Sequence, residues 1–474
     1  MDKLIYTSKK SPSINIDISR FQNKPLQKKT SYVGADRLKF RVPGNMANTF
    51  LDNNYGLMLK GKINLQTISD DAVISTFDLV LDKPGVASCI KDIYINIGGV
   101  TIPYESYNIN QCNISDLESN PLYRANTGLL LEGTTGYAEG AKLQVIREAD
   151  GSVTAANAPK SILEFCIPLH TILSTDQLIP LFGSAPIEIE IVLEDAGKIG
   201  AYQYQETSGP DKTITNNIVT YTDIELQGQY IIFSDQAFNA INNMHGGLYE
   251  LHATNWYHSQ DTIDAGTKQF VSHINATVSS MKRILICHRN SDLILSNGRT
   301  LAEGVSSESL SLGHHINDLK QWYIELDNVS YPNTPVKNMT GTTYGGPMFY
   351  ELMNADDKFG VVSSGCSLNA PAGWSSAIKF SYAPFNLDQT ADGSPYGGTA
   401  YRIGSYLSGF NFEVMNHGKS RSMRDGLSTV GSDFDYHATF NTAATNDVVI
   451  DYFVQADVKL ILDTRGSNVL TYIS

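Results

Sequence analysis

The chain has 474 residues, 42% of them hydrophobic, which is enough for two or three domains with sizeable cores. Only 18% are charged, against roughly 25% in an average soluble protein, and the formal net charge is −14. There is no apolar run of about 18 residues, so we expect no membrane-spanning helix. The acidic balance argues against a nucleic-acid-binding body.

The amino-terminal region is basic, unlike the rest of the chain. Residues 1–41 contain ten Lys/Arg and three Asp/Glu, a net charge of +7, so the remainder carries −21. We interpret residues 1–30 as an extended arm whose cations could meet anionic lipid or a genome, with a solvated tail as the alternative. The basic side chains of this arm are Lys3, Lys9, Lys10, Arg20, Lys24, Lys28 and Lys29.

The cellular compartment is indicated by the first residues and by the cysteines. The start, MDKLIYTSKKSPS, lacks the apolar core of a signal peptide. The five cysteines lie far apart and form no CxxC pair. We therefore expect synthesis in a reducing compartment without secretion, and neither a disulfide framework nor a zinc ribbon.

The first elements are predicted to be strands. Alternating apolar residues favour strands at 31–43 and 55–68. The sequence IYINIGGVTIPY at 93–104 predicts a hairpin, because the central glycines can adopt the positive φ angles of a tight turn. Residues 113–132 look partly helical and suit an excursion from the sheets.

Residues 163–194 form the stretch around which the first half is organised. The spacing of Ser174 and Gln177 is that of a helix capping box, so we predict strand, one helical turn and strand. One face of the second strand is acidic and is expected to be wet, with Glu188, Glu190 and Glu194. The predicted core positions are Leu163, Phe165, Ile167, Leu169, Ile187, Ile189, Ile191 and Leu193.

The chain then continues through a predicted polar loop at 196–217 and a strand at 218–233. A helix capped by Ser234 or Asp235 follows. The second half is also predicted to alternate strands with polar loops, although its sequence does not repeat that of the first half. Its predicted strand regions are 271–290, 322–336, 378–414 and 448–462.

These segments together resemble a known family in their order and spacing. The pattern at 163–194, the Gly98-Gly99 hairpin and the strand-then-helix at 218–241 resemble the first half of double jelly-roll major capsid proteins. Those proteins build the shells of large eukaryotic DNA viruses, virophages, Polinton-like viruses, adenoviruses and tailless phages. The resemblance implies an all-β fold with two consecutive eight-stranded jelly rolls, short helices and long loops. The expected division is an arm at 1–30, a first jelly roll at 31–240 and a second at 241–474.

The same resemblance implies a function. The chain would form homotrimeric capsomers of pseudo-hexagonal outline that tile an icosahedral virion shell. Its partners would be neighbouring capsomers, minor capsid and penton proteins, and an inner membrane or genome through the basic arm. It would be made in the reducing interior of the host cell and reside in the virion.

Catalytic motifs were sought and none was found. The sequence contains no GxSxG, no HExxH and no GxGxxG before a helix, so we expect no enzyme, no cofactor and no metal. His245, His252 and His258 lack the spacing of metal ligands on one strand. In GSDFDYHATF the best metal candidates, Asp433, Asp435 and His437, alternate, which equally suits a half-buried strand. Asp388, Asp392 and Gly393 resemble a calcium loop but lack its bidentate Glu.

Two other functions remain open on the sequence alone. One is a non-viral, two-domain β-sandwich module that binds glycans through its Tyr/Asn-rich loops. The other is a cupin-like or glycosidase-type enzyme on a jelly roll, because paired carboxylates cannot be recognised among 49 acidic residues. A trimer in solution would favour the capsid protein, glycan binding the second function and bound metal the third.

Overall fold

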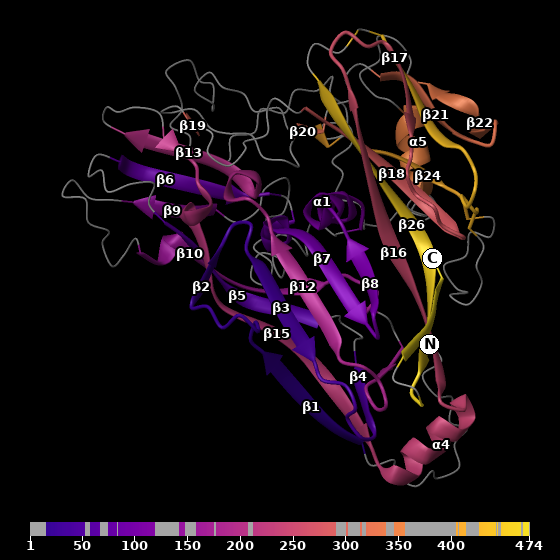
Figure 1. Cartoon of the computed structure of the whole chain (residues 1–474). Helices are drawn as coiled ribbons and strands as arrows, with labels where there is room; N and C mark the ends of the chain where they lie inside the picture. Colours follow the sequence, from indigo (N-terminus) through magenta and orange to yellow (C-terminus); the bar gives the residue numbers. More distant parts are fainter. Residues whose placement is uncertain are drawn as a thin grey trace.

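The structure is a computed structural model of the whole chain (Figure 1). It describes residues 16–52, 57–66, 74–82, 84–118, 142–146, 158–174, 177–206, 212–290, 300–301, 313–314, 319–337, 346–355, 404–405, 407–413, 426–441, 443, 447–465 and 468–473. None of the helices in these ranges has the length and apolar character that crossing a membrane requires.

The first half of the chain forms two main sheets around one core. In the larger sheet, the long strand β15 pairs on one side with β1 and on the other with β5, which in turn pairs with β10. These strands are β1 (Ile16–Asn23), β15 (Val219–Phe233), β5 (Leu57–Leu65) and β10 (Ile162–Leu169). The four-stranded sheet has the order β3 (Arg37–Val42), β12 (Ile187–Leu193), β7 (Ile90–Ile97) and β8 (Val100–Tyr104).

The second half repeats this topology. Its long strand β26 pairs on one side with β16 and on the other with β18, which pairs with β24. These strands are β16 (Leu248–Ile263), β26 (Val448–Asp463), β18 (Met281–Asn290) and β24 (Leu407–Asn411). The four-stranded sheet has the order β17 (Gln269–His273), β25 (Phe434–Phe440), β21 (Leu319–Leu326) and β22 (Val329–Lys337).

The two halves therefore match strand for strand. Read along the chain, β1, β3, β5, β7, β8, β10, β12 and β15 correspond to β16, β17, β18, β21, β22, β24, β25 and β26. Two facing antiparallel sheets with this connectivity are a jelly roll. The predicted all-β double jelly roll is confirmed, although the sequence itself shows no repeat.

This correspondence changes how the amino-terminal arm is divided. Residues 16–23 lie within the expected arm, yet they form β1, which takes in the first jelly roll the place that β16 takes in the second. The sheet of the first half therefore includes residues of the expected arm from Ile16 on, and the domain division itself stays a prediction. The link to the second jelly roll is helix α4 (Asp235–His245), which contains the expected boundary at 240.

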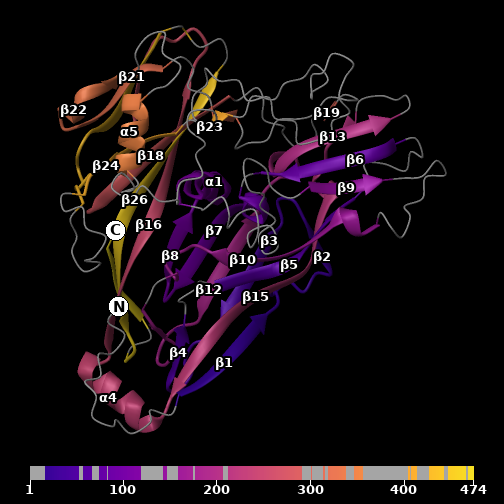
Figure 2. The same ribbon diagram turned by 180° about the vertical axis from the view of Figure 1, so that it is seen from behind.

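Insertions add structure at the end of the molecule opposite α4 (Figures 1 and 2). Three loops of the first jelly roll contribute β6 (Ile74–Leu81), β9 (Lys142–Ile146) and β13 (Gly200–Glu206), which form one sheet. The polar loop predicted at 196–217 is therefore wrong in part, because β13 pairs with β6 and buries Tyr202. Among the described residues, the α-helices besides α4 are α1 (Tyr107–Glu118) and α5 (Gly346–Ala355).

Shorter strands complete the sheets. They are β2 (Ser31–Val33), β4 (Thr49–Asp52), β11 (Ile179–Pro180), β14 (Lys212–Thr213), β19 (Thr300–Leu301), β20 (Gly313–His314), β23 (Gly404–Ser405) and β27 (Asn468–Ile473). Pairing of β14 with β19 joins an insertion of the first jelly roll to one of the second.

The organising stretch at 163–194 has the two predicted strands, β10 and β12. They lie in opposite sheets. The predicted helical turn lies partly outside the described residues, at 175–176, and the side chains of its expected capping box bond elsewhere. The Ser174 hydroxyl donates to the Leu169 carbonyl, and the Gln177 amide oxygen accepts the His252 N–H. Glu194 is also buried, not wet, because β12 ends at Leu193 and the Glu194 carboxylate turns inward to accept from Asn108.

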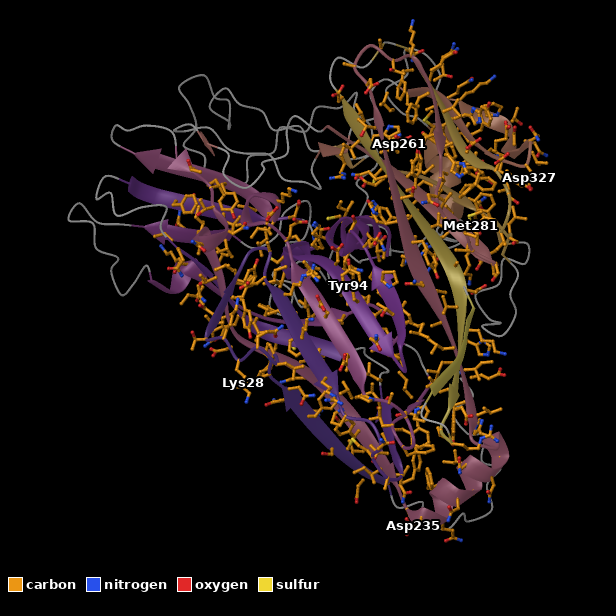
Figure 3. The ribbon with its side chains drawn as sticks, viewed as in Figure 1. Lys28, Tyr94, Asp235, Asp261, Met281 and Asp327 are labelled. Atoms are coloured by element: carbon orange, nitrogen blue, oxygen red, sulfur yellow. The ribbon has the colours of Figure 1, made fainter. Side chains whose placement is uncertain are left out.

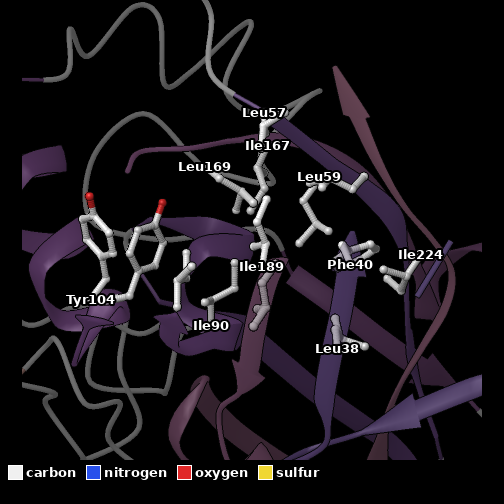
Figure 4. Packing of buried hydrophobic residues seen from close by; sticks show 14 of the residues in the cluster. Leu38, Phe40, Leu57, Leu59, Ile90, Tyr104, Ile167, Leu169, Ile189 and Ile224 are labelled. Atoms are coloured by element: carbon white, nitrogen blue, oxygen red, sulfur yellow. The ribbon is translucent and has the colours of Figure 1, made fainter. Parts of the chain in front are cut away.

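The core of the first jelly roll shows why β12 is essential (Figure 4). Ile189 is 2% exposed and lies between Phe40 of β3 and Ile95 of β7. On the other face, Glu190 contacts Arg37 at 2.7 Å and Lys39 at 3.0 Å, and both cations are more than half exposed. The alternation predicted from the sequence is confirmed at these two positions.

Two neighbouring substitutions test this register. Ile189→Asp should abolish soluble protein, because a carboxylate buried without a partner costs several kcal/mol. Glu190→Ala should cost about 1 kcal/mol or less, because exposed ion pairs contribute little. Soluble yield and urea unfolding of both variants measure the difference. A severe loss in Glu190→Ala would show that the face is misassigned.

Candidate functional site

The contact between the two jelly rolls is the most extensively built site of the molecule. At the end near α4, five aromatic side chains from both halves meet in one cluster. Phe182 lies 4.6 Å from Phe238 of α4 and 5.5 Å from Tyr249 of β16, measured between ring centroids. Phe50 packs edge-on against Phe182 and Phe233. Such ring pairs add about 0.5–1.5 kcal/mol each beyond the area that they bury.

Beside this cluster the two backbones come into direct contact. Gly183 has a φ of 59°, and a Cβ atom added there would lie 1.9 Å from the carbonyl oxygen of Thr464. Only glycine allows this approach. Thr464 in turn donates its N–H and its hydroxyl to the Gly247 carbonyl. The loop after β11 is thus locked against the strand end that closes the second jelly roll.

Farther from α4, helix α1 ties the two jelly rolls together. Asn108 holds α1 to its own jelly roll by donating to the buried carboxylate of Glu194 at 2.9 Å. Ile109 packs into the core of the second jelly roll. Asn113 donates to the Cys287 sulfur of β18 at 3.6 Å, and the Ser106 hydroxyl lies 3.3 Å from His258 Nδ1 of β16. Helix α1 therefore belongs to one jelly roll and docks on the other.

Beneath α1 lies a buried charge network on the outer face of the larger sheet of the second jelly roll. Asp451 of β26 is fully buried and accepts from Arg289 Nε of β18 at 2.5 Å. Its other oxygen lies 2.9 Å from His258 Nε2 and 3.3 Å from Gln260 Nε2, both on β16. The Asp451 carboxylate thus connects β26 to β16 and β18. Through His258 and Ser106 it is also linked to the first jelly roll.

The electrostatics of this network favour the charged state. Burial raises the pKa of Asp451, but Arg289 and His258 outweigh it and hold that pKa at about 2. Burial lowers the pKa of Arg289, and the opposing effect of Asp451 raises it overall. Both groups therefore remain ionised throughout the neutral pH range, and Asp451 and Arg289 form a permanent buried ion pair.

The chemistry available at this junction is that of a structural contact. Burial raises the pKa of the Cys287 thiol, so the thiolate that would act as a nucleophile is disfavoured. Within the described ranges, no group of three His, Cys, Asp or Glu side chains has the arrangement of a metal site.

The histidines considered from sequence do not come together. His258 is the only one of the three in the buried network, whereas His245 stacks on Tyr249 and His252 lies 3.8 Å from Glu250. Sequence reasoning missed Asp451 and Arg289. Their single signal is a charged residue within an apolar strand pattern, as in VVIDYFV.

The metal candidates on β25 lie on a half-buried strand. Phe434 and Tyr436 are buried, as the alternation predicts. On the opposite face, Asp435 lies 3.0 Å from His273, and His437 stacks on Tyr323 with centroids 4.4 Å apart. Asp433 precedes the strand. The calcium-like residues Asp388, Asp392 and Gly393 lie outside the described residues.

The predicted basic arm is only partly described. Lys3, Lys9 and Lys10 lie outside the described residues. Arg20 belongs to β1, and Lys29 pairs with Asp36 at 2.9 Å. Lys24 and Lys28 follow β1, with Lys28 on the outer side of the first jelly roll (Figure 3). An inward-facing role for these seven side chains stays a prediction.

Comparison with known proteins identifies the fold. No family model and no curated protein matches the sequence. The Faustovirus major capsid protein is similar in structure, with a TM-score of 0.52 and 10% identity, over 96% of this chain and 92% of that one. The PBCV-1 virus capsid has a TM-score of 0.54 and 10% identity, over 98% of this chain and 99% of that one. This chain has the double jelly-roll fold. At such low identity the likeness establishes the fold alone, and the junction above is what joins the two jelly rolls.

The buried pair provides a test of the junction. Arg289→Met should lower the free energy of unfolding by about 3–5 kcal/mol, because it leaves the Asp451 charge buried without its main partner. The double variant Arg289→Met/Asp451→Leu should recover most of that loss, because apolar replacement of both partners is often neutral. Chemical denaturation of both proteins gives the two values. Equal loss in the single and double variants would show that the pair stabilises the junction in its own right.

Proposed function

We propose that the chain is the major capsid protein of an icosahedral DNA virus and assembles as a homotrimer. The observation that carries the proposal is the fixed pairing of two topologically equivalent jelly rolls in one chain. Three such chains around a threefold axis supply six similar lobes, which approximates a hexagon. The full-length likeness to the two capsid structures supports the same conclusion.

The composition of the chain supports a protein that functions within an assembly. Only 18% of the residues are charged, which suits a chain that hides much of its surface in contacts with other subunits. Specific contacts with minor capsid and penton proteins belong to the same proposal.

The two ends of the molecule differ, and we propose an orientation from that difference. The insertion strands β6, β9 and β13 gather at one end, whereas α4 and the first residue of β1 lie at the other, where Ile16 pairs with Phe233 (Figures 1 and 2). The fifteen residues before β1, which include Lys3, Lys9 and Lys10, are therefore attached at the α4 end. In our proposal the α4 end faces the interior of the virion, and the basic residues meet anionic headgroups or nucleic acid there.

Native mass spectrometry or light scattering of the purified chain tests the assembly. A mass of about 156 kDa, three times 52.0 kDa, is expected. A monomer of 52.0 kDa that is retained on glycan columns would contradict the proposal and favour the binding module.

The orientation has a separate test. Deletion of residues 2–15 removes Lys3, Lys9 and Lys10 and leaves β1 intact, so the trimer should persist. Binding to vesicles with anionic lipid or to duplex DNA, measured at low salt by cosedimentation, should fall several-fold. Replacing the three lysines by glutamine is the matched variant of normal length. Unchanged binding in both variants would contradict the inward role of the arm.

A further inference from the structure

The internal repeat matches a buried isoleucine of the first jelly roll with a buried histidine of the second. Ile63 of β5 pairs with Tyr221, the third residue of β15. His288 of β18 pairs with Ile450, the third residue of β26. Because β5 corresponds to β18 and β15 to β26, Ile63 and His288 are counterparts, and both are 0% exposed. The second jelly roll therefore has a titratable group where the first has a hydrocarbon side chain.

The imidazole of His288 lies in the core of the second jelly roll. Its Nε2 atom is 3.3 Å from the hydroxyl of Tyr436 on β25, in the facing sheet. Its ring centroid lies 6.2 Å from those of Tyr436 and Phe440. Tyr436 also packs against Tyr452 and Trp322, with centroids 5.6 Å and 6.4 Å away. These four aromatic side chains are buried, so His288 is enclosed by a layer of rings.

The ionised pair next to His288 lies on the other face of the sheet. Asp451 is opposite Cys287 in register and bonds to Arg289 there. Burial lowers the pKa of His288 to about 4, and the charge of Asp451 raises that pKa only in part. Other titratable side chains on the elements that pack on or face β18 are Cys287 on β18 itself, His314 on β20, Glu351 on α5, Tyr436 on β25 and Tyr452 on β26. Burial raises the pKa of Cys287 and of Tyr452, so both stay neutral at and below neutral pH.

From this arrangement we infer that the second jelly roll opens in acid before the first, with His288 as the proton-sensing group. Protonation places a positive charge inside a core of aromatic rings, where water cannot solvate it. The first jelly roll has no such response at the matching position, because Ile63 does not titrate. The inference does not depend on the trimer. In a capsomer it makes the second jelly roll of each chain the half that yields to acid.

The direction of the effect follows from the linkage of protonation to folding. The pKa of His288 is about 4 in the fold, against 6.5 for an ordinary histidine. The stability that the neutral ring contributes is therefore complete above about pH 6.5 and is lost as the pH falls towards 4. Between about pH 7 and about pH 4.5, this one group should lower the folding equilibrium constant roughly 50-fold. Asp451 loses its own contribution only in stronger acid, because its pKa is about 2.

Tryptophan fluorescence follows the second half of the chain alone. All three tryptophans, Trp256, Trp322 and Trp374, belong to that half of the sequence. Urea unfolding of the full chain, followed by this signal at about pH 7 and about pH 4.5, gives the pH-dependent loss of folding.

His288→Gln isolates the contribution of the histidine. The glutamine amide can still bond to the Tyr436 hydroxyl, but it does not titrate, so the loss between the two pH values should be roughly 50-fold smaller than in the wild type. His273→Gln is the matched control, because the His273 side chain is 60% exposed on β17 of the same jelly roll. The control should show the wild-type loss. Equal losses in wild type and His288→Gln, or the same reduction in the control, overturn the inference.

Hydrogen exchange of the wild-type protein provides a second test that needs no variant. After correction for the intrinsic pH dependence of exchange, protection of β18 peptides at about pH 4.5 should fall roughly 50-fold, whereas β5 peptides should keep theirs. Unchanged protection of β18, or an equal fall in β5, overturns the inference. Either result leaves the proposed capsid function standing, because that function is tested by the native mass.

Discussion

The contact between the two jelly rolls reaches, through Ser106 and His258, a buried charge in the second, the carboxylate of Asp451. Asp451 is fully buried on an outer sheet face, where a carboxylate would normally be hydrated. It is tolerated because Arg289 neutralises it and because His258 and Gln260 occupy its second oxygen. Ser106, directly before α1, lies 3.3 Å from His258 Nδ1 and so joins the first jelly roll to this network.

The second constraint lies near α4, where the two jelly rolls are held by apolar packing. The aromatic cluster and the close approach of Gly183 to Thr464 leave little freedom for one jelly roll to rotate against the other. Two separate contacts, the polar one made by Ser106 and Asn113 and the aromatic one near α4, fix an orientation far better than either alone. A rigid pair of equivalent jelly rolls is what a pseudo-hexagonal capsomer requires, since flexible halves would not present repeated surfaces.

The strands were predictable from sequence where one face is buried and the other wet. Ile187, Ile189 and Ile191 of β12 and the hairpin at Gly98-Gly99 lie where the alternation predicts. The repeat of the topology was not visible, because β1 and β16 share a pairing position without sharing a sequence. β1 falls within the predicted arm because residues 1–30 are polar and basic, and only the short run at 13–18 alternates there.

The junction was beyond the reach of sequence for a physical reason. Asp451 and Arg289 are 162 residues apart, and Ser106 and His258 are 152 apart, so only the folded topology brings them together. The alternation of apolar and polar residues along a strand predicts which of its side chains are buried. It carries no information about which distant segment contacts them. The capping box at Ser174 failed similarly, because the Gln177 side chain bonds to the backbone of His252 in the other half.

Electron microscopy of the purified protein, in the trimer that we propose, is the most direct measurement of the central claim, that the junction holds two equivalent jelly rolls at a fixed angle. Class averages viewed down the threefold axis should show six lobes of similar size in a near-hexagonal outline, with the two lobes of each chain at one constant separation. Three-lobed particles, or lobes whose separation varies from particle to particle, would contradict the account.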